Sequence, residues 1–240
     1  MTELLYQTDS YLKTFEAVVT AVDSQENGVV LNRTAFYPGG GGQPADVGTL
    51  IVAGVGYPVV RVRKAGDDVV HVVEGPLPPI GTTVTGQLDW ERRYQLMRTH
   101  TAMHILCGVV WRDYGASVTG GNMEPLKGRM DFEFERLQKE LVQEIERKIN
   151  AEVAAARPVR TAILPREEAF QIPDLIRTRI NLLPEGITRV RVVEIVGLDL
   201  QADGGTHVAS TAEVGPIRIT DYTSKGGINK RLYVALEPEG

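Results

Sequence analysis

The chain has 240 residues, of which 42% are hydrophobic and 24% are charged, so it can bury a sizeable core and wholesale disorder is excluded. Its net charge of -5 is not that of a strongly basic nucleic-acid-binding domain, although a local basic patch can act on an acidic protein. The single cysteine, Cys107, excludes an internal disulfide. No apolar run reaches 18 residues and the N-terminus lacks the pattern of a signal peptide, so we expect a cytoplasmic protein with no membrane contact.

The first part of the chain, residues 1–88, reads as all-β. Short runs rich in β-branched residues recur between turn-forming Gly, Asp and Asn, which is typical of a small barrel or sandwich. We predict a small β-barrel domain with strands within 15–22, 28–37, 48–54, 57–66, 67–75 and 82–88.

The second part, residues 89–240, changes to an α+β pattern. A long helix is expected between Asp89, a suitable N-cap, and Gly115, a suitable stop. Apolar residues at every fourth position predict a second helix over 135–156. Helices should therefore pack on an antiparallel sheet. The expected strands are 159–164, 189–196, 215–222 and 231–236, with a short helix at 166–171.

Three of the four histidines could form a metal site. His100 and His104 lie four apart on the predicted helix, so their imidazoles share a face. His207 follows Gly204 and Gly205, which would let the backbone bend tightly and bring positions 203 and 207 together. A partly buried polar face is the alternative for the helical pair alone. The fourth histidine, His71, alternates with valines and is expected to be a strand residue.

Two residues compete for the fourth ligand position. Cys107 offers a thiolate, but it lies about 10 Å along the helix from His100, too far for three ligands on one straight helix to close a tetrahedron. Asp203 has the better placement and is favoured. The alternatives are that Asp203 only forms the turn before Gly-Gly, and that water completes the site.

At these residues the sequence resembles a known family. "RTHTAMHIL" and "GGTHVAST" resemble the two metal-binding motifs of the alanyl-tRNA synthetase editing domain. "RTAFYPGGGGQPADVGTL" resembles the glycine-rich motif of the AlaX-type trans-editing proteins, in their medium-length form, and "GRMDFEF" resembles the family's strand after the first helix. The family pattern is HxxxH followed by CxxxH, whereas position 203 is Asp. A carboxylate is a harder ligand, in the hard–soft sense, than a thiolate, so manganese and iron become alternatives to zinc.

The resemblance implies a metal-dependent deacylase that removes serine, and in some cases glycine, from tRNA(Ala). It implies one zinc ion per chain on His100, His104, Asp203 and His207, with His100 and His104 in the catalytic centre. A pocket for alanine cannot strongly reject serine, which adds only a hydroxyl group, so a second site must remove the error.

Substrate and tRNA contacts are expected at further residues. Thr119 is a candidate reader of the serine hydroxyl, or simply the start of a glycine turn. Gly41, Gly42 and Gln43 could approach the acceptor end, or form only a flexible turn between strands. Candidate phosphate contacts, each of which could equally be a solvated cation, are Arg92, Arg93, Arg98, Lys225, Lys230 and Arg231.

Two other functions remain open at this point. A different metal-dependent hydrolase, acting on small esters or amides, could share the scaffold. A non-catalytic RNA-binding module with a decayed metal site is the third possibility, and Asp203 is the residue that keeps it open.

Overall fold

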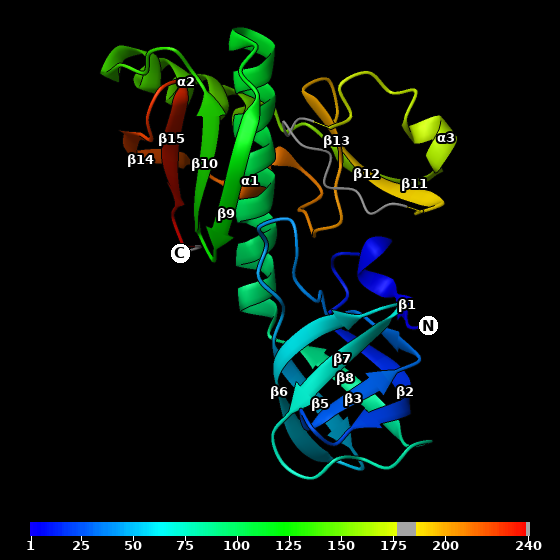
Figure 1. Cartoon of the computed structure of the whole chain (residues 1–240). Coiled ribbons are helices and arrows are strands. Elements are labelled where there is room, and N and C mark those ends of the chain that lie inside the picture. Colours follow the sequence, from blue (N-terminus) through cyan, green and yellow to red (C-terminus); the bar gives the residue numbers. More distant parts are fainter. Residues whose placement is uncertain (177–185, 239–240) are drawn as a thin grey trace. The chain divides into compact units, whose positions relative to one another are not determined.

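A computed structural model describes residues 1–176 and 186–238 and divides the chain into two compact units, Met1–Gln95 and Leu96–Gly240 (Figure 1). The division falls inside the long helix α1, Trp90–Tyr114. The architecture is α+β, with a closed antiparallel barrel followed by helices and separate antiparallel sheets, which confirms the predicted fold class.

The first unit is a six-stranded barrel with the order β2-β3-β7-β6-β5-β8. Inward and outward side chains alternate along β2 and β8, as the pleat of a half-buried sheet requires. The inward side chains, among them Val29, Leu31 and Leu50, form one apolar core. The strands are β2 (Thr14–Asp23), β3 (Gly28–Leu31), β5 (Gly48–Val52), β6 (Val55–Ala65), β7 (Asp68–Val73) and β8 (Thr83–Leu88), preceded by β1 (Glu3–Leu4), which pairs with β4 (Arg33–Thr34), and by the short helix η1 (Leu5–Gln7).

His71 lies on strand β7 and is buried inside the barrel unit, as predicted for a strand residue. Its Nε2 is 2.7 Å from the Thr34 hydroxyl and its Nδ1 is 3.2 Å from the Val29 carbonyl. Burial lowers the pKa of His71 to about 4, against a smaller opposing effect of the Val29 carbonyl. The ring is therefore a neutral structural group.

The second unit contains helix α1 from Leu96 onward, two antiparallel sheets and helix α2 (Lys139–Ala154). Ile145, Ile149 and Val153 form the buried stripe of α2, close to the predicted spacing. One sheet has the order β14-β15-β10-β9 and the other β11-β12-β13. Their strands are β9 (Val118–Glu124), β10 (Lys127–Glu133), β11 (Val159–Pro165), β12 (Arg189–Ile195), β13 (Asp199–Ala202), β14 (Ile217–Ser224) and β15 (Asn229–Leu236), with short helices α3 (Arg166–Ala169) and η2 (Thr211–Val214).

Two strands of this unit were not expected from the sequence. Strand β9 contains Gly120 and Gly121, which suggested a turn, and β13 is only four residues long. Each is held by backbone pairing to a neighbour, β10 for β9 and β12 for β13. Such pairing comes from the partner strand, so local composition does not reveal it.

No helix within the described ranges combines the length and the apolarity needed to cross a bilayer.

Candidate metal centre

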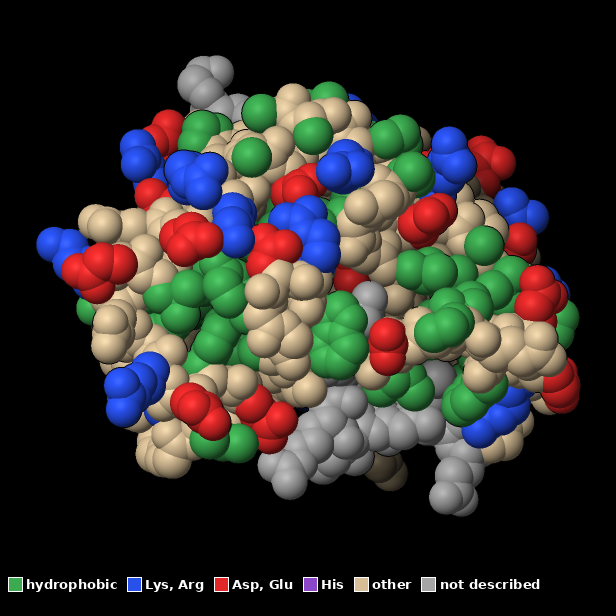
Figure 2. All heavy atoms as spheres, turned by 90° about the horizontal axis from the view of Figure 1, so that it is seen from above, with side chains coloured by type: hydrophobic (Ala, Val, Ile, Leu, Met, Phe, Trp, Pro, Cys, Tyr) green, Lys and Arg blue, Asp and Glu red, His purple; other side chains and the backbone are tan. Residues whose placement is uncertain are grey.

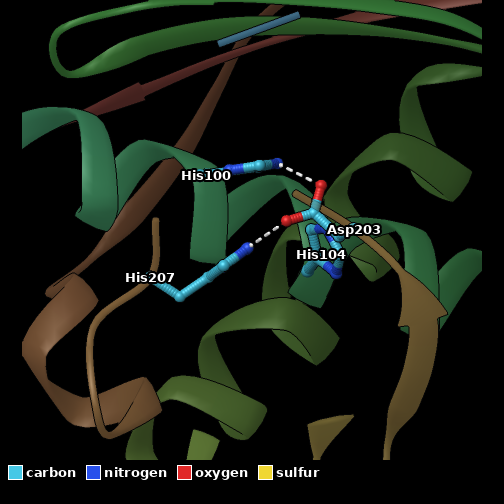
Figure 3. A group of neighbouring side chains, drawn as sticks. All are labelled: His100, His104, Asp203 and His207. Carbon is cyan, nitrogen blue, oxygen red and sulfur yellow. Dashed lines mark hydrogen bonds and ion pairs between the residues drawn. The ribbon is translucent and has the colours of Figure 1, made fainter. Parts of the chain in front are cut away.

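Helix α1 and the loop after β13 bring four candidate ligands together. His100 and His104 come from one face of the helix, and Asp203 and His207 come from the loop (Figure 3). One ligand atom of each residue lies within 4.8 Å of the others. The three histidines are buried and Asp203 is nearly so, so the group is a buried polar cluster.

The distances suit a small divalent cation. Asp203 Oδ1 lies 3.5 Å from His100 Nε2, and Asp203 Oδ2 lies 3.0 Å from His207 Nε2. Ligands of a tetrahedral zinc ion with bonds of about 2.0–2.1 Å are about 3.3–3.4 Å apart. Three imidazoles and one carboxylate are also a donor set that zinc accepts. The residues present therefore fit the metal that the sequence pattern implied.

Asp203 also closes its own turn. The backbone N–H of Gly205 donates to Asp203 Oδ2 at 2.7 Å, and Arg191 Nη1 donates to the Asp203 carbonyl at 3.0 Å. Positions 203 and 207 do come together, as expected, but neither Gly204 nor Gly205 is among the described residues with positive φ, so the bend uses no left-handed glycine. The hydrogen bond from Gly205 to the side chain of Asp203 closes this turn. The carboxylate of Asp203 therefore both forms the turn and belongs to the four-residue group.

The electrostatics of the group favour cation binding at neutral pH. Burial acts to raise the pKa of Asp203, but the imidazole of His100 and the hydrogen bond to His207 hold it well below its ordinary value. Burial lowers the pKa of His207 to about 4, and burial likewise lowers the pKa of His100 well below its ordinary range. An ionised carboxylate thus faces the neutral imidazoles of His100 and His207.

His104 differs from the other two histidines. Burial lowers its pKa, but the hydrogen bond to Asp199 and the charge of Asp203 outweigh burial, so the net shift is upward. Asp199 Oδ2 lies 3.2 Å from His104 Nδ1, on the side of the ring away from Nε2. The Thr101 hydroxyl lies 3.2 Å from His207 Nδ1 in the same way. Sequence reasoning missed both residues: Thr101 sits inside the histidine motif, but Asp199 has no local signal beyond being an acid between leucines.

Cys107 is buried and lies outside the four-residue group. It accepts a hydrogen bond from Gln201 Nε2 at 3.3 Å. Its place in the interior of the second unit agrees with the geometric argument against a third helical ligand.

The glycine-rich segment of the first unit is a defined tight turn. Gly39, Gly40, Gly41 and Gly42 all have positive φ, a region that disfavours any other residue. Gly40 and Gln43 exchange two backbone hydrogen bonds, of 3.1 and 2.9 Å. The Gln43 side chain is buried. The turn explains all four glycines without a ligand, and its contact with substrate stays a proposal.

Thr119 lies within strand β9 and not at the start of a turn. Val118 pairs with Phe132 and Gly120 pairs with Asp131, so Thr119 is the extra residue of a β-bulge. Bulges re-aim a side chain and are common beside functional sites. The turn alternative for this residue is therefore wrong, and its role as a hydroxyl reader stays a proposal.

Two of the six candidate tRNA contacts are buried structural residues. Arg93 is fully buried, and Arg93 Nε lies 3.0 Å from both carboxylate oxygens of Asp46. Arg98 is 3% exposed and donates to the carbonyls of Val214 and Glu237 at 2.9 Å each. Their guanidinium groups are occupied inside the protein, which contradicts the expectation that they contact phosphate.

The other four cations differ in availability. Lys230 is buried and donates to the Gly227 carbonyl, and Arg231 donates to both oxygens of Asp131 at 2.6 and 2.7 Å. Arg92 is half-buried and Lys225 is exposed. Figure 2 shows cationic and anionic side chains interspersed on the face it presents, with no histidine at that surface. Arg92 and Lys225 are the better placed of these candidates.

Two family models and several named proteins match this chain. A family profile described as "tRNA synthetases class II (A)" matches residues 3–92. A second, "Threonyl and Alanyl tRNA synthetase second additional domain", matches residues 190–233, which include Asp203 and His207. The Methanosarcina acetivorans protein named alanyl-tRNA editing protein AlaX-M is 38% identical over 244 residues, 98% of this chain and 99% of its own length. The chain belongs to the alanyl-tRNA editing family.

Two further relatives are similar to this chain. The AlaX-M protein of Saccharolobus solfataricus is also 38% identical, over 99% of this chain and 100% of its own. The alanine–tRNA ligase of Pyrobaculum aerophilum is 42% identical over 225 residues, which cover 90% of this chain but only 25% of the ligase. The match thus spans nearly the whole length of the editing proteins and about a quarter of the ligase, and the resemblance read from the motifs is confirmed.

Proposed function

We propose that this protein is a trans-editing hydrolase that deacylates mischarged tRNA(Ala), mainly seryl-tRNA(Ala), with glycyl-tRNA(Ala) as a second substrate. The observation that carries the proposal is the buried convergence of His100, His104, Asp203 and His207 within 4.8 Å. Full-length relatives named alanyl-tRNA editing proteins support the choice of tRNA over small esters.

The proposed centre takes one zinc ion per chain. Zinc held there would supply Lewis-acid polarisation of the ester carbonyl. The residues of the chain orient the site: the Nδ1 atoms of His104 and His207 face Asp199 and Thr101, so their Nε2 atoms face the cluster. Asp203 contributes the negative charge and, through its bond to Gly205, holds the loop that carries His207.

Selection of serine requires a polar contact to its hydroxyl group, because alanine would leave a buried partner unpaired. Thr119 on its bulge and Gln43 beside the glycine turn, with Gly41 and Gly42, are the proposed substrate contacts. Arg92 and Lys225 are the proposed phosphate contacts, with Arg231 available only if it leaves Asp131. Binding through phosphates should weaken as salt rises.

The test is a deacylation assay on seryl-, glycyl- and alanyl-tRNA(Ala), with zinc quantified in the same chelator-free sample. We expect about one zinc per chain, loss of seryl and glycyl esters, and survival of alanyl-tRNA(Ala). His104→Ala should lose both zinc and activity. His71→Gln is the matched control, because it removes the one histidine outside the cluster and should keep the zinc.

Two results would reject the proposal. Survival of seryl-tRNA(Ala) while small esters are cleaved would indicate the other hydrolase. Folded protein that holds no metal and stays inactive with added zinc would indicate a non-catalytic RNA-binding module.

A further inference from the structure

Asp199 occupies a position behind the candidate metal centre that only the second unit's tertiary structure creates. It is the first residue of β13, and its side chain is fully buried. Its carboxylate faces Nδ1 of His104 at 3.2 Å. It does not belong to the four-residue group, and His104 is the member of that group that it faces.

A glycine makes this approach possible. Gly108 lies one helical turn after His104, on the same face of α1. A Cβ atom on Gly108 would lie 2.9 Å from Leu198 Cγ and 3.0 Å from Asp199 Cβ. The first separation is shorter than real carbon contacts and the second is very tight, so a side chain at 108 would have to displace Leu198 or Asp199. The glycine thus lets the carboxylate reach the imidazole.

A further contact orients the carboxylate. Gln201 lies two residues after Asp199 on the same face of β13. Its Nε2 donates to Asp199 Oδ2 at 2.6 Å and to Cys107 Sγ at 3.3 Å. The amide therefore spans from the strand to the helix and restricts the rotation of the acid.

We propose that Asp199 is a positioning residue that holds His104 in the Nδ1–H tautomer and turns its Nε2 lone pair toward the metal. The inference rests on the proposed zinc centre. Asp199 Oδ2 already accepts a hydrogen bond from Gln201 Nε2, so it acts as an acceptor and the ring nitrogen that faces it carries the proton. The other nitrogen is then left as the donor atom for a cation. Outer partners of this kind are worth about 10- to 100-fold in metal affinity.

The experiment measures zinc affinity of the full chain by competition with a chromophoric chelator, together with the absorption spectrum of the cobalt-substituted protein. Asp199→Asn should weaken zinc binding about 10- to 100-fold and alter the cobalt spectrum. Asp113→Asn is the matched control: it removes a carboxylate from the same helix that pairs with Arg112 and Lys148, and should leave both readouts unchanged.

Gly108→Ala gives an independent arm if Asp199→Asn does not fold. We expect Gly108→Ala alone to weaken zinc binding. Added to Asp199→Asn, it should lower zinc affinity by less than about a further twofold, because both changes act on one contact. Thermal unfolding of the metal-free proteins accompanies each measurement.

Zinc affinity of Asp199→Asn within twofold of the unaltered protein, with an unchanged cobalt spectrum, would overturn the inference and leave the metal centre intact. Additive losses for Gly108→Ala and Asp199→Asn would also overturn it, because the glycine would then act by another route. Failure of the unaltered protein to bind zinc would reject the proposed centre and the inference together.

Discussion

Arg93 is expected to stabilise the barrel unit and not to bind tRNA. Its guanidinium is fully buried and forms a bidentate pair with Asp46. It also donates to the carbonyls of Ser10, at 3.0 Å, and Ala35. Arg93→Met keeps an aliphatic stem in this space but removes the charge and every donor. Asp46 would then be a buried carboxylate whose described remaining partner is the N–H of Tyr37, at 2.6 Å.

The size of the effect follows from these contacts. Removing one member of a buried ion pair costs about 3–5 kcal/mol, because the other charge stays buried. The Tyr37 N–H offsets part of that cost, while the two carbonyls lose donors worth about 1 kcal/mol each. We therefore expect a loss of about 3–5 kcal/mol for Arg93→Met. Adding Asp46→Asn should restore part of the loss, because the unpaired charge is then gone.

Urea unfolding followed by the fluorescence of Trp90 measures this change. The chain has two tryptophans, so a Trp111→Phe background leaves Trp90 as the reporter of the first unit. Arg92→Met is the matched control, because Arg92 is only half-buried; it should cost less than about 1 kcal/mol and weaken tRNA binding instead. A loss below 1 kcal/mol for Arg93→Met, with weakened tRNA binding, would refute the structural role.

Three further predictions concern the site and the glycine turn. Asp203→Cys should keep or tighten zinc affinity while weakening manganese affinity, measured by chelator competition; unchanged affinities would mean that Asp203 only forms the turn. Zinc affinity should fall about tenfold for each pH unit below the raised pKa of His104, because one proton competes there, while the lowered pKa values of His100 and His207 keep those ligands neutral; a flat profile from pH 7 to 5 would contradict this. Gly40→Ala should cost about 1–3 kcal/mol in the Trp90 unfolding assay, because Gly40 has a φ of 132°; an unchanged midpoint would show that the turn relaxes freely.

Much of the secondary structure could be predicted from short segments of sequence, because the spacing of apolar residues is a property of each segment. Alternation along β2 and the four-residue spacing in α2 are properties of single segments. Strands β9 and β13 escaped prediction because their backbones pair with strands that lie elsewhere in the chain. The bend at Gly204 and Gly205 was anticipated, but its closure by a hydrogen bond from Gly205 to the side chain of Asp203, without a left-handed glycine, was not.

The candidate site divides in the same way. The four-residue group could be predicted from the spacing of His100 and His104 and from the short loop between Asp203 and His207. Helix and turn geometry bring such neighbours together. The burial of Arg93 and Arg98 was not foreseeable, because a basic residue in a sequence looks the same whether it meets phosphate or a buried carbonyl.

The sequence by itself determined which side chains could hold a metal, the family they resemble and the all-β character of the first unit. Only the tertiary structure decided that Asp199 lies behind His104, that Gly108 leaves room for it, and that Arg93 closes on Asp46. The physical reason is that these contacts join residues 47 to 95 positions apart. Their distances depend on how strands and helices pack, which no local pattern of residues records.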